Sequence, residues 1–454
     1  MKKLIKSYNI FIILAVAVVL LTVVCVPVYG LGDMSEYLSV FQNTGLYNVS
    51  EDTLCIAQSY GIDTNSQGAQ NLFEMFLGSI VNLNKILFSD TVFNIHFLSS
   101  VYCIVFLLGM YFLQKNTKLE KPSLNYLFSA LLSVVFLDLG YLAYFNSFYS
   151  EALIFVLVIS IAALTVSLIH KFSYLKIILL SLCLVVFSGL KVTGALIALL
   201  FGVLLVLYFK DAEGKKKILS AVLATLVIVT SAVSVFSAQI PARDVKLYNH
   251  VYNDIVQNNK GDFSDLNLKE VVDNPTIEDM EEAVADITYG DLVKYYAKNP
   301  SVFINSLKSA ANNSYFLILD FASYREAGAY YGIRDMLNLK IWNKLRRTVI
   351  PSGLPVILIF MVAYVCVSVK EYLKYSKIKD RNRYGVALFC TVLPVAAICE
   401  MIGTVLTTGQ ILISKNMFVF GIYFDLMIVT AIVWGVSTLV SRRDSIKEKY
   451  GVNQ

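Results

Sequence analysis

Long apolar stretches recur along almost the whole chain and are separated by short polar or basic segments. Each stretch approaches the about 20 residues that an α-helix needs to cross the hydrocarbon core of a bilayer. The pattern predicts ten membrane-spanning helices, at residues 9–29, 94–113, 125–145, 152–168, 175–187, 192–209, 218–238, 354–369, 384–406 and 416–440. The fifth is the weakest of these predictions, because it is short and runs directly into the turn at 188–191.

Composition agrees with this pattern. Of the 454 residues, 57% are hydrophobic and 16% are charged, and the mean hydropathy is +0.65. These values exclude a soluble globular domain. We therefore expect an all-α integral membrane fold with about ten transmembrane helices.

Lysine and arginine predict the orientation, because short basic loops stay on the cytoplasmic side. The ten spans place six short segments on one side, at 1–8, 114–124, 169–174, 210–217, 370–383 and 441–454, and these hold more than half of the 38 basic residues. We expect a multi-pass protein of the cell membrane with both termini in the cytoplasm. The net charge of +5 follows from these loops and gives no reason to expect a nucleic-acid partner. No small-x-small cleavage site follows the first span, so we expect an uncleaved anchor.

Two long segments fall on the extracytoplasmic side and predict two helical loop regions. We expect an N-terminal transmembrane module at 1–238, with about seven helices and the loop 30–93, a helical loop domain at 239–350, and a C-terminal module at 351–454 with about three helices and a cytoplasmic tail. In the first loop, the apolar run 73–83 is typical of a helix in the membrane interface. In the second, Thr276 and Pro300 predict helix starts. The stretch 336–347 predicts an interfacial helix whose basic residues, including Arg346, face lipid phosphates.

Four carboxylates fall within or at the edge of the predicted spans: Asp138, Glu151, Glu400 and Asp425. A charged group in a bilayer costs a few kcal/mol on insertion scales, so each is a functional candidate. The competing interpretation is burial against a basic partner for packing alone. For Asp425 the two interpretations have equal weight, whereas the neighbours of Glu151 favour function.

Those neighbours form an aromatic and polar turn, YFNSFYSE at 144–151. Aromatic residues at a membrane interface are ordinary, but Asn146, Tyr149 and Glu151 together offer hydrogen bonds and a flat face, which a sugar ring needs. On the same predicted side, Lys191 and Lys415 stand at the outer ends of spans. They are candidates to bind the phosphate of a lipid-borne substrate, with simple snorkelling as the alternative.

An acidic pair, Asp33 and Glu36, follows the first span. The pair is compatible with helix capping. It would also suit a base held at the membrane surface, or ligands of a divalent metal such as Mg²⁺ or Mn²⁺, although the sequence requires no cofactor. No Walker, zinc or Ser/His/Asp pattern is present, so the energy for a synthetic reaction must arrive with the substrate.

Five stretches resemble one family, the bacterial glycan biosynthesis hexose transferases, which are similar to C-type glycosyltransferases. They are Gly32-Asp33, YFNSFYSE at 144–151, YNHVYN at 248–253, YYAKNP at 295–300, and KNMFVF at 415–420 with Asp425. The resemblance implies a many-helix membrane enzyme that takes a sugar from a polyprenyl-phosphate carrier outside the cytoplasm. By resemblance, Asp33 is the base or metal-organising residue with Glu36 in support. Met34 and Asn416 depart from the family pattern, where an aromatic residue and a histidine are usual.

The resemblance and the residues predict the same function, hexosyl transfer from a polyprenyl-phosphate sugar to a cell-surface glycan, lipid or protein acceptor at the extracytoplasmic face. Asn146, Tyr149 and Glu151 would line the sugar site, and Lys191 and Lys415 would contact the phosphate. One alternative is a flippase or transporter for lipid-linked glycans that uses Asp138, Glu400 and Asp425 as a path through the membrane. Another is a polymerase or ligase that joins whole lipid-linked glycans.

Overall fold

The structure is a computed structural model, and it describes residues 7–24, 29–31, 37–49, 59–63, 66, 68–117, 119, 121–209, 213–237, 245–258, 260–272, 275–314, 321–323, 340–350, 353–411 and 413–450. Eight described helices are long and apolar enough to cross a membrane. They are α1 (Ser7–Val19) with its continuation η1 (Leu20–Val24), α4 (Ile95–Asn116), α7 (Ser150–His170), α9 (Val192–Phe209), α10 (Gly214–Ser237), α17 (Leu354–Lys377), α18 (Arg381–Thr408) and α20 (Phe418–Tyr450). The prediction of a helical multi-pass membrane protein is confirmed.

The third predicted span, 125–145, is not one continuous helix. It consists of α5 (Pro122–Phe136) followed by α6 (Leu139–Leu142) and η2 (Ala143–Asn146), with a bend of 55° at the break. At the break, Asp138 Oδ1 accepts a hydrogen bond from the Gly140 N–H at 2.8 Å. An Asp side chain that bonds the backbone competes with helix continuation, and it caps the start of α6 instead. The third predicted span therefore bends at its carboxylate, Asp138.

The fifth predicted span corresponds to α8 (Tyr174–Ser188), an apolar helix of 15 residues. At 1.5 Å per residue it is about 22 Å long, which is less than the thickness of a hydrocarbon core. All ten predicted stretches therefore contain apolar helices, and α8 is the shortest that is unbroken.

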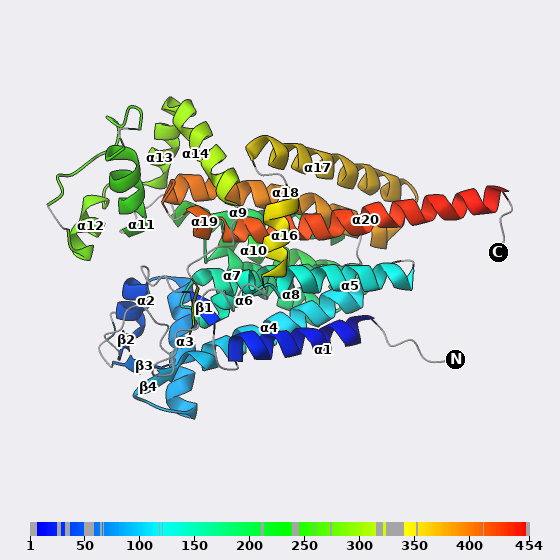
Figure 1. The fold of residues 1–454 in the computed structure, drawn as a ribbon, viewed down its shortest axis with the longest axis horizontal. Coiled ribbons are helices and arrows are strands. Elements are labelled where there is room, and N and C mark those ends of the chain that lie inside the picture. The colour runs from blue at the N-terminus through cyan, green and yellow to red at the C-terminus, as the bar shows by residue number, and fades with distance from the viewer. Residues whose placement is uncertain are drawn as a thin grey trace.

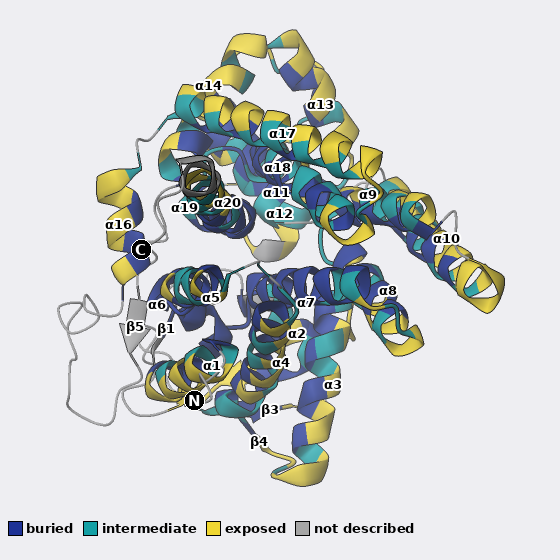
Figure 2. Ribbon diagram, turned by 90° about the vertical axis from the view of Figure 1, so that its right-hand side faces the viewer, coloured by how far each residue is buried: buried dark blue, intermediate teal, exposed yellow. Residues whose placement is uncertain are grey.

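The helices lie side by side in one bundle, and the start of α1 and the end of α20 lie at the same end of it, on the right in Figure 1. Most elements of the loop regions gather at the opposite end, on the left, whereas α16 (Ile341–Val349) lies beside the middle of the bundle. Along the bundle, α7 is buried over nearly its whole length, whereas α10 and α17 are mostly exposed on its outside (Figure 2). Exposed Ile, Leu and Val side chains cover these outer helices, as expected of surfaces that face lipid.

The first loop region contains strands as well as the predicted helices. Three short strands pair antiparallel in the order β2-β3-β4, and two helices pack beside them: β2 (Leu46–Asn48), β3 (Ser59–Ile62), β4 (Val92–Asn94), α2 (Tyr37–Thr44) and α3 (Leu72–Leu87). Helix α3 covers the predicted interfacial run and lies across the bundle axis (Figure 1). It exposes Met75, Ile86 and Leu87, which suits a helix resting on a membrane surface.

The second loop region contains the helices α11 (Val245–Tyr248), η3 (Asn249–Val256), α12 (Ile277–Ala283), α13 (Tyr289–Lys298), α14 (Pro300–Asn313) and α16 (Ile341–Val349). Both predicted helix starts are confirmed. Thr276 forms a capping box with Asp279, and Pro300 is the first residue of α14. Helices α13 and α14 pack against α18, and α19 (Ile413–Asn416) follows α18 at this contact.

A two-stranded antiparallel pair connects the two loop regions. Strand β1 (Tyr29–Leu31) follows the first span, and it pairs with β5 (Phe321–Ser323), with Gly30 opposite Ala322. Strand β1 also packs against η2, the end of the broken span. The pair thus joins residues from three distant parts of the sequence at the loop end of the bundle.

Candidate functional site

Glu151 and Lys191 form an ion pair at the loop end of the bundle. Glu151 lies in the first turn of α7, and Lys191 lies in the turn between α8 and α9. The Lys191 Nζ is 2.7 Å from Glu151 Oε1, and the side chains are 26% and 1% exposed, respectively. A carboxylate buried to this degree needs a partner because the desolvation of a charge costs several kcal/mol.

Lys415 joins this pair from the other end of the sequence. Its Nζ lies 3.7 Å from the centre of the Tyr149 ring, a cation–π contact, and the residue is 2% exposed. The positive charges of Lys415 and Lys246 act on Glu151 together with that of Lys191. We call Tyr149, Glu151, Lys191 and Lys415 the lysine cluster. It combines an aromatic face, a carboxylate and ammonium groups, and its most exposed charged side chain is Lys191.

Four of the seven predicted site residues thus come together in the lysine cluster. Asp33 and Glu36 lie outside the described residues, and β1 ends two residues before Asp33 in the sequence. Glu151 and Lys191 bind each other, and their predicted roles as sugar and phosphate contacts stay predictions.

Asn146 lies at the end of the broken span and is held by neighbouring helices. It is fully buried, its Nδ2 donates to the Val23 carbonyl at 3.1 Å, and its Oδ1 accepts from Ser99 Oγ at 2.5 Å. The amide therefore joins η2 to η1 and α4. A side chain held in this way from both ends bridges these elements, and a role of Asn146 in lining the sugar site stays a prediction.

A second polar network lies where α16 meets α20 and the broken span. Asp425 Oδ2 accepts from Tyr141 Oη and Trp342 Nε1, both at 2.6 Å, and lies 3.3 Å from an Arg346 guanidinium nitrogen. Arg346 and Asp425 are both fully buried. Asp138 Oδ2 accepts from the Asn343 N–H at 3.1 Å, which gives α16 a second attachment. We call this set the arginine network.

The arginine network corrects one expectation about α16. The helix exposes Lys344 and Arg347, as expected of an interfacial helix, but Arg346 points inward to Asp425 instead of toward lipid phosphates. The physical reason is that Asp425, buried in α20, requires a positive partner, and Arg346 meets that requirement. The packing interpretation of Asp425 is therefore the one that the structure supports.

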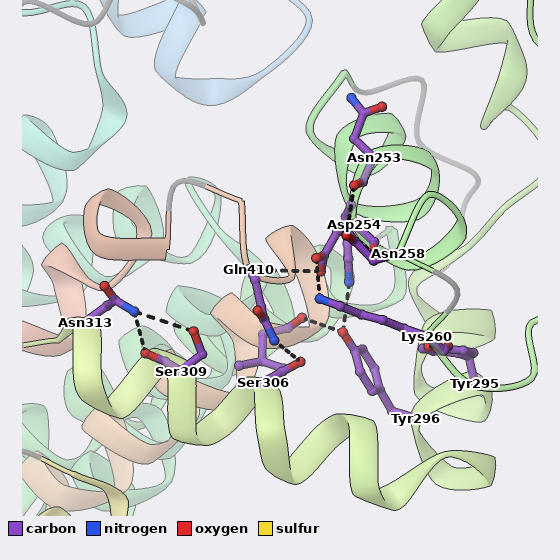
Figure 3. Close-up of polar contacts among 12 residues, drawn as sticks. Asn253, Asp254, Asn258, Lys260, Tyr295, Tyr296, Ser306, Ser309, Asn313 and Gln410 are labelled. Carbon is purple, nitrogen blue, oxygen red and sulfur yellow. Dashed lines mark hydrogen bonds and ion pairs between the residues drawn. The ribbon is translucent and has the colours of Figure 1, made fainter.

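A third cluster joins the second loop region to the turn that follows α18 (Figure 3). His250 Nε2 and Tyr296 Oη lie 2.9 Å apart, and Lys260 Nζ lies 2.5 Å from Asp254 Oδ1. Asp254 Oδ2 accepts from the Gln410 N–H at 3.0 Å. These residues were not candidates on sequence grounds. The only signal was that His250 and Tyr296 fall within the YNHVYN and YYAKNP stretches of the resemblance.

The buried imidazole of His250 predicts a pH dependence of this contact. Burial lowers the pKa of His250 from its ordinary value to about 4, although Asp254 acts in the opposite direction. The folded pKa lies below the unfolded value of about 6.5, so the unfolded segment takes up the proton first as the pH falls. Burial of neutral His250 therefore lowers the local free energy of unfolding only in acid: there is no such loss well above pH 6.5, and the loss grows as the pH falls from 6.5 toward 4. We expect local stability to be about 2 kcal/mol lower at pH 5 than at pH 7.5.

Hydrogen exchange of residues 245–256 in the purified protein measures this effect, after correction for intrinsic exchange rates. The matched control is His250→Gln, which keeps a hydrogen-bonding group for Tyr296 but does not titrate. An equal pH dependence in wild type and His250→Gln would contradict the assignment.

Among the described residues, no group of three or more His, Cys, Asp or Glu side chains is arranged to hold a metal ion. The acidic pair of Asp33 and Glu36, on which a metal was considered, lies outside these residues. Three buried carboxylates, Glu151, Asp254 and Asp425, are instead paired with lysine or arginine.

Comparison with curated proteins finds no match. Among solved structures, the chain is similar to the archaeal oligosaccharyltransferase AglB from Archaeoglobus fulgidus, solved in complex with an inhibitory peptide and a dolichol-phosphate. The sequence identity is 12%, the TM-score is 0.40, and the similarity covers 98% of this chain and 52% of that one, so this chain spans about half the length of its structural relative. The model of one protein family matches residues 1–267 and 267–452. On this match, the chain belongs to the family described as the YfdI N-terminal transmembrane domain.

Proposed function

We propose that the protein is a membrane glycosyltransferase that moves a hexose from a polyprenyl-phosphate carrier to a cell-surface glycan, lipid or protein acceptor. The observation that carries the proposal is the lysine cluster, in which Lys191 binds Glu151 and Lys415 lies over Tyr149 at the loop end of the bundle. Ammonium groups next to an aromatic face, at the edge of apolar helices, suit a phosphate that is attached to both a sugar and a lipid. The basic segments at the opposite end favour an extracytoplasmic position for this site.

In the proposed reaction, a hydroxyl oxygen of the acceptor attacks the anomeric carbon of the hexose. The bond from that carbon to the phosphate oxygen breaks, and polyprenyl phosphate leaves with the bonding electrons. Lys191 and Lys415 would stabilise the charge that grows on the leaving phosphate. Glu151 would hold Lys191 in place. The proton of the acceptor hydroxyl would pass to Asp33, with Glu36 in support. Alternatively, these two carboxylates would hold a divalent metal, which would supply positive charge to neutralise the leaving phosphate.

The arginine network weighs against the alternative of a flippase or transporter. A path for protons or substrate needs carboxylates that can change partners. Asp425 is instead held by Tyr141, Trp342 and Arg346, and Asp138 is held by two backbone N–H groups. A polymerase or ligase would use a similar outer site and is distinguished from single-sugar transfer by its donor, a lipid-linked glycan chain.

The decisive experiment supplies purified protein with a polyprenyl-phosphate hexose and an acceptor. We expect free polyprenyl phosphate to be released, and Asp33→Asn to lower the rate by about 100-fold or more because the base is lost. The control is Asp90→Asn, an exposed carboxylate in the same loop. Full activity in Asp33→Asn would remove Asp33 from the mechanism. Movement of lipid-linked glycans across vesicles, without transfer by the wild type, would favour the transporter.

A further inference from the structure

Lys415 is carried by a very short helix, so its position depends on what surrounds that helix. Helix α19 is a single turn, closed by the Met417 N–H and the Ile413 carbonyl at 2.9 Å. One turn is too short to be stable by itself. The place of the Lys415 ammonium over Tyr149 must therefore be fixed by contacts from other elements.

Several of those contacts come from the second loop region, about 100 residues or more earlier in the sequence. Asp254 in η3 accepts the Gln410 N–H at 3.0 Å, directly after α18. Ser306 in α14 adds a weaker bond to Gln410 Nε2 at 3.4 Å (Figure 3), and Asn313 in the same helix accepts from Ser414 Oγ at 3.3 Å. The bond from Asp254 is the only one of the three made by a charged group, and such bonds are roughly twice as strong as neutral ones.

The turn itself is built around Asp254. Gly409 ends α18 with a φ of +59°, a conformation that favours glycine. A Cβ at this position would lie 2.4 Å from Asp254 Oδ2 and 2.4 Å from His250 Cδ2. The carboxylate is 5% exposed and is held from its other oxygen by Lys260 at 2.5 Å. Asp254 is thus anchored in the loop region and fits closely against the backbone that leads to α19.

We propose that Asp254 is a positioning residue, which fixes the Gly409–Gln410 turn and thereby holds α19 so that Lys415 lies over Tyr149 beside Glu151. Only the role of Lys415 toward the substrate rests on the proposed function; the positioning of Lys415 by Asp254 does not. Asn416, the last residue of α19, is bonded to both sides of the turn: its Nδ2 donates to the Ile411 carbonyl at 3.3 Å, and its own carbonyl accepts from Thr404 Oγ1 in α18 at 3.1 Å. The second loop region then controls the geometry of the lysine cluster without touching the substrate.

The test uses full-length protein with 3-fluorotyrosine at position 149, whose ¹⁹F resonance senses the ammonium group over its ring. Lys415→Met gives the reference position for the loss of that group. We expect Asp254→Leu to move the resonance most of the way to the Lys415→Met position, and Asp254→Asn to keep it near wild type, because the amide oxygen still accepts the Gln410 N–H. The matched control is Asp265→Asn, which removes the exposed ion pair with Lys298 in the same loop region.

Gly409→Ala provides a second variant, since it leaves Asp254 in place and forces the turn away from it. We expect the same resonance change, and in both disruptive variants a fall in kcat/KM for a polyprenyl-phosphate hexose of about 100-fold, as for a misplaced catalytic contact. A wild-type resonance in folded Asp254→Leu or Gly409→Ala would overturn the proposal. Unfolding of both variants would also overturn it, because Asp254 would then be merely structural. Absence of transfer in wild type, with the resonance changes intact, would refute the proposed function alone.

Discussion

Replacing Arg346 by methionine should lower the free energy of unfolding by about 3–5 kcal/mol, the range for breaking a buried ion pair. The variant leaves the Asp425 carboxylate fully buried, with Tyr141 and Trp342 as donors but without a positive charge. Methionine retains much of the length of the arginine side chain, so lost packing contributes little. Chemical unfolding in detergent, followed by the fluorescence of Trp342 and Trp434, measures the change.

Arg347→Met is the matched control, because Arg347 is the next residue on α16 and is exposed. We expect that substitution to stay within about 0.5 kcal/mol of wild type. The double variant Arg346→Met/Asp425→Leu should recover most of the lost stability, because it removes both buried charges. A single variant as stable as Arg347→Met would show that Asp425 is neutral or hydrated in the folded protein.

The arginine network also shows where sequence reasoning succeeds and where it stops. The pattern of α16 predicts an amphipathic interfacial helix, and α16 does expose Lys344 and Arg347. Which of its basic residues turns inward depends on Asp425, about 80 residues later, and no local pattern contains that information. Likewise, Asp138 was identified as a carboxylate within a span, but the bend that it introduces depends on its bond to Gly140.

The membrane-spanning helices could be predicted because the thickness of the bilayer sets the length of the apolar stretch that each one needs. The structure of the loop regions was harder to predict, because short strands such as β2 and β3 have too few residues to show an alternating pattern. The lysine cluster could be predicted only in part. Topology placed Tyr149, Glu151, Lys191 and Lys415 at one end of the bundle, but only the fold shows that Glu151 binds Lys191. Asp254 bonds the backbone next to Gly409, and no signal in either segment relates the two.

Lys191→Met should reduce both stability and transfer, and a second substitution should separate the two effects. The single variant leaves Glu151, whose side chain is 1% exposed, without its nearest positive partner. We expect a loss of several kcal/mol, reduced by the remaining charges of Lys246 and Lys415. It should also lower kcat by about 100-fold or more, if Lys191 stabilises the leaving phosphate. Unfolding in detergent and release of polyprenyl phosphate measure the two quantities on the same samples.

In the double variant Glu151→Gln/Lys191→Met, both members of the buried pair lose their charge, so stability should return toward wild type while transfer stays low. The control is the Lys294–Asp291 pair on α13, also close at 2.9 Å, in which the lysine side chain is 73% exposed. Its coupling energy should not exceed about 0.5 kcal/mol. For Glu151 and Lys191 we expect a coupling energy of several kcal/mol. Regained transfer in the double variant would mean that Lys191 serves only to neutralise Glu151. The phosphate would then have to be held by Lys415, and the geometry over Tyr149 would carry the whole of the proposed site.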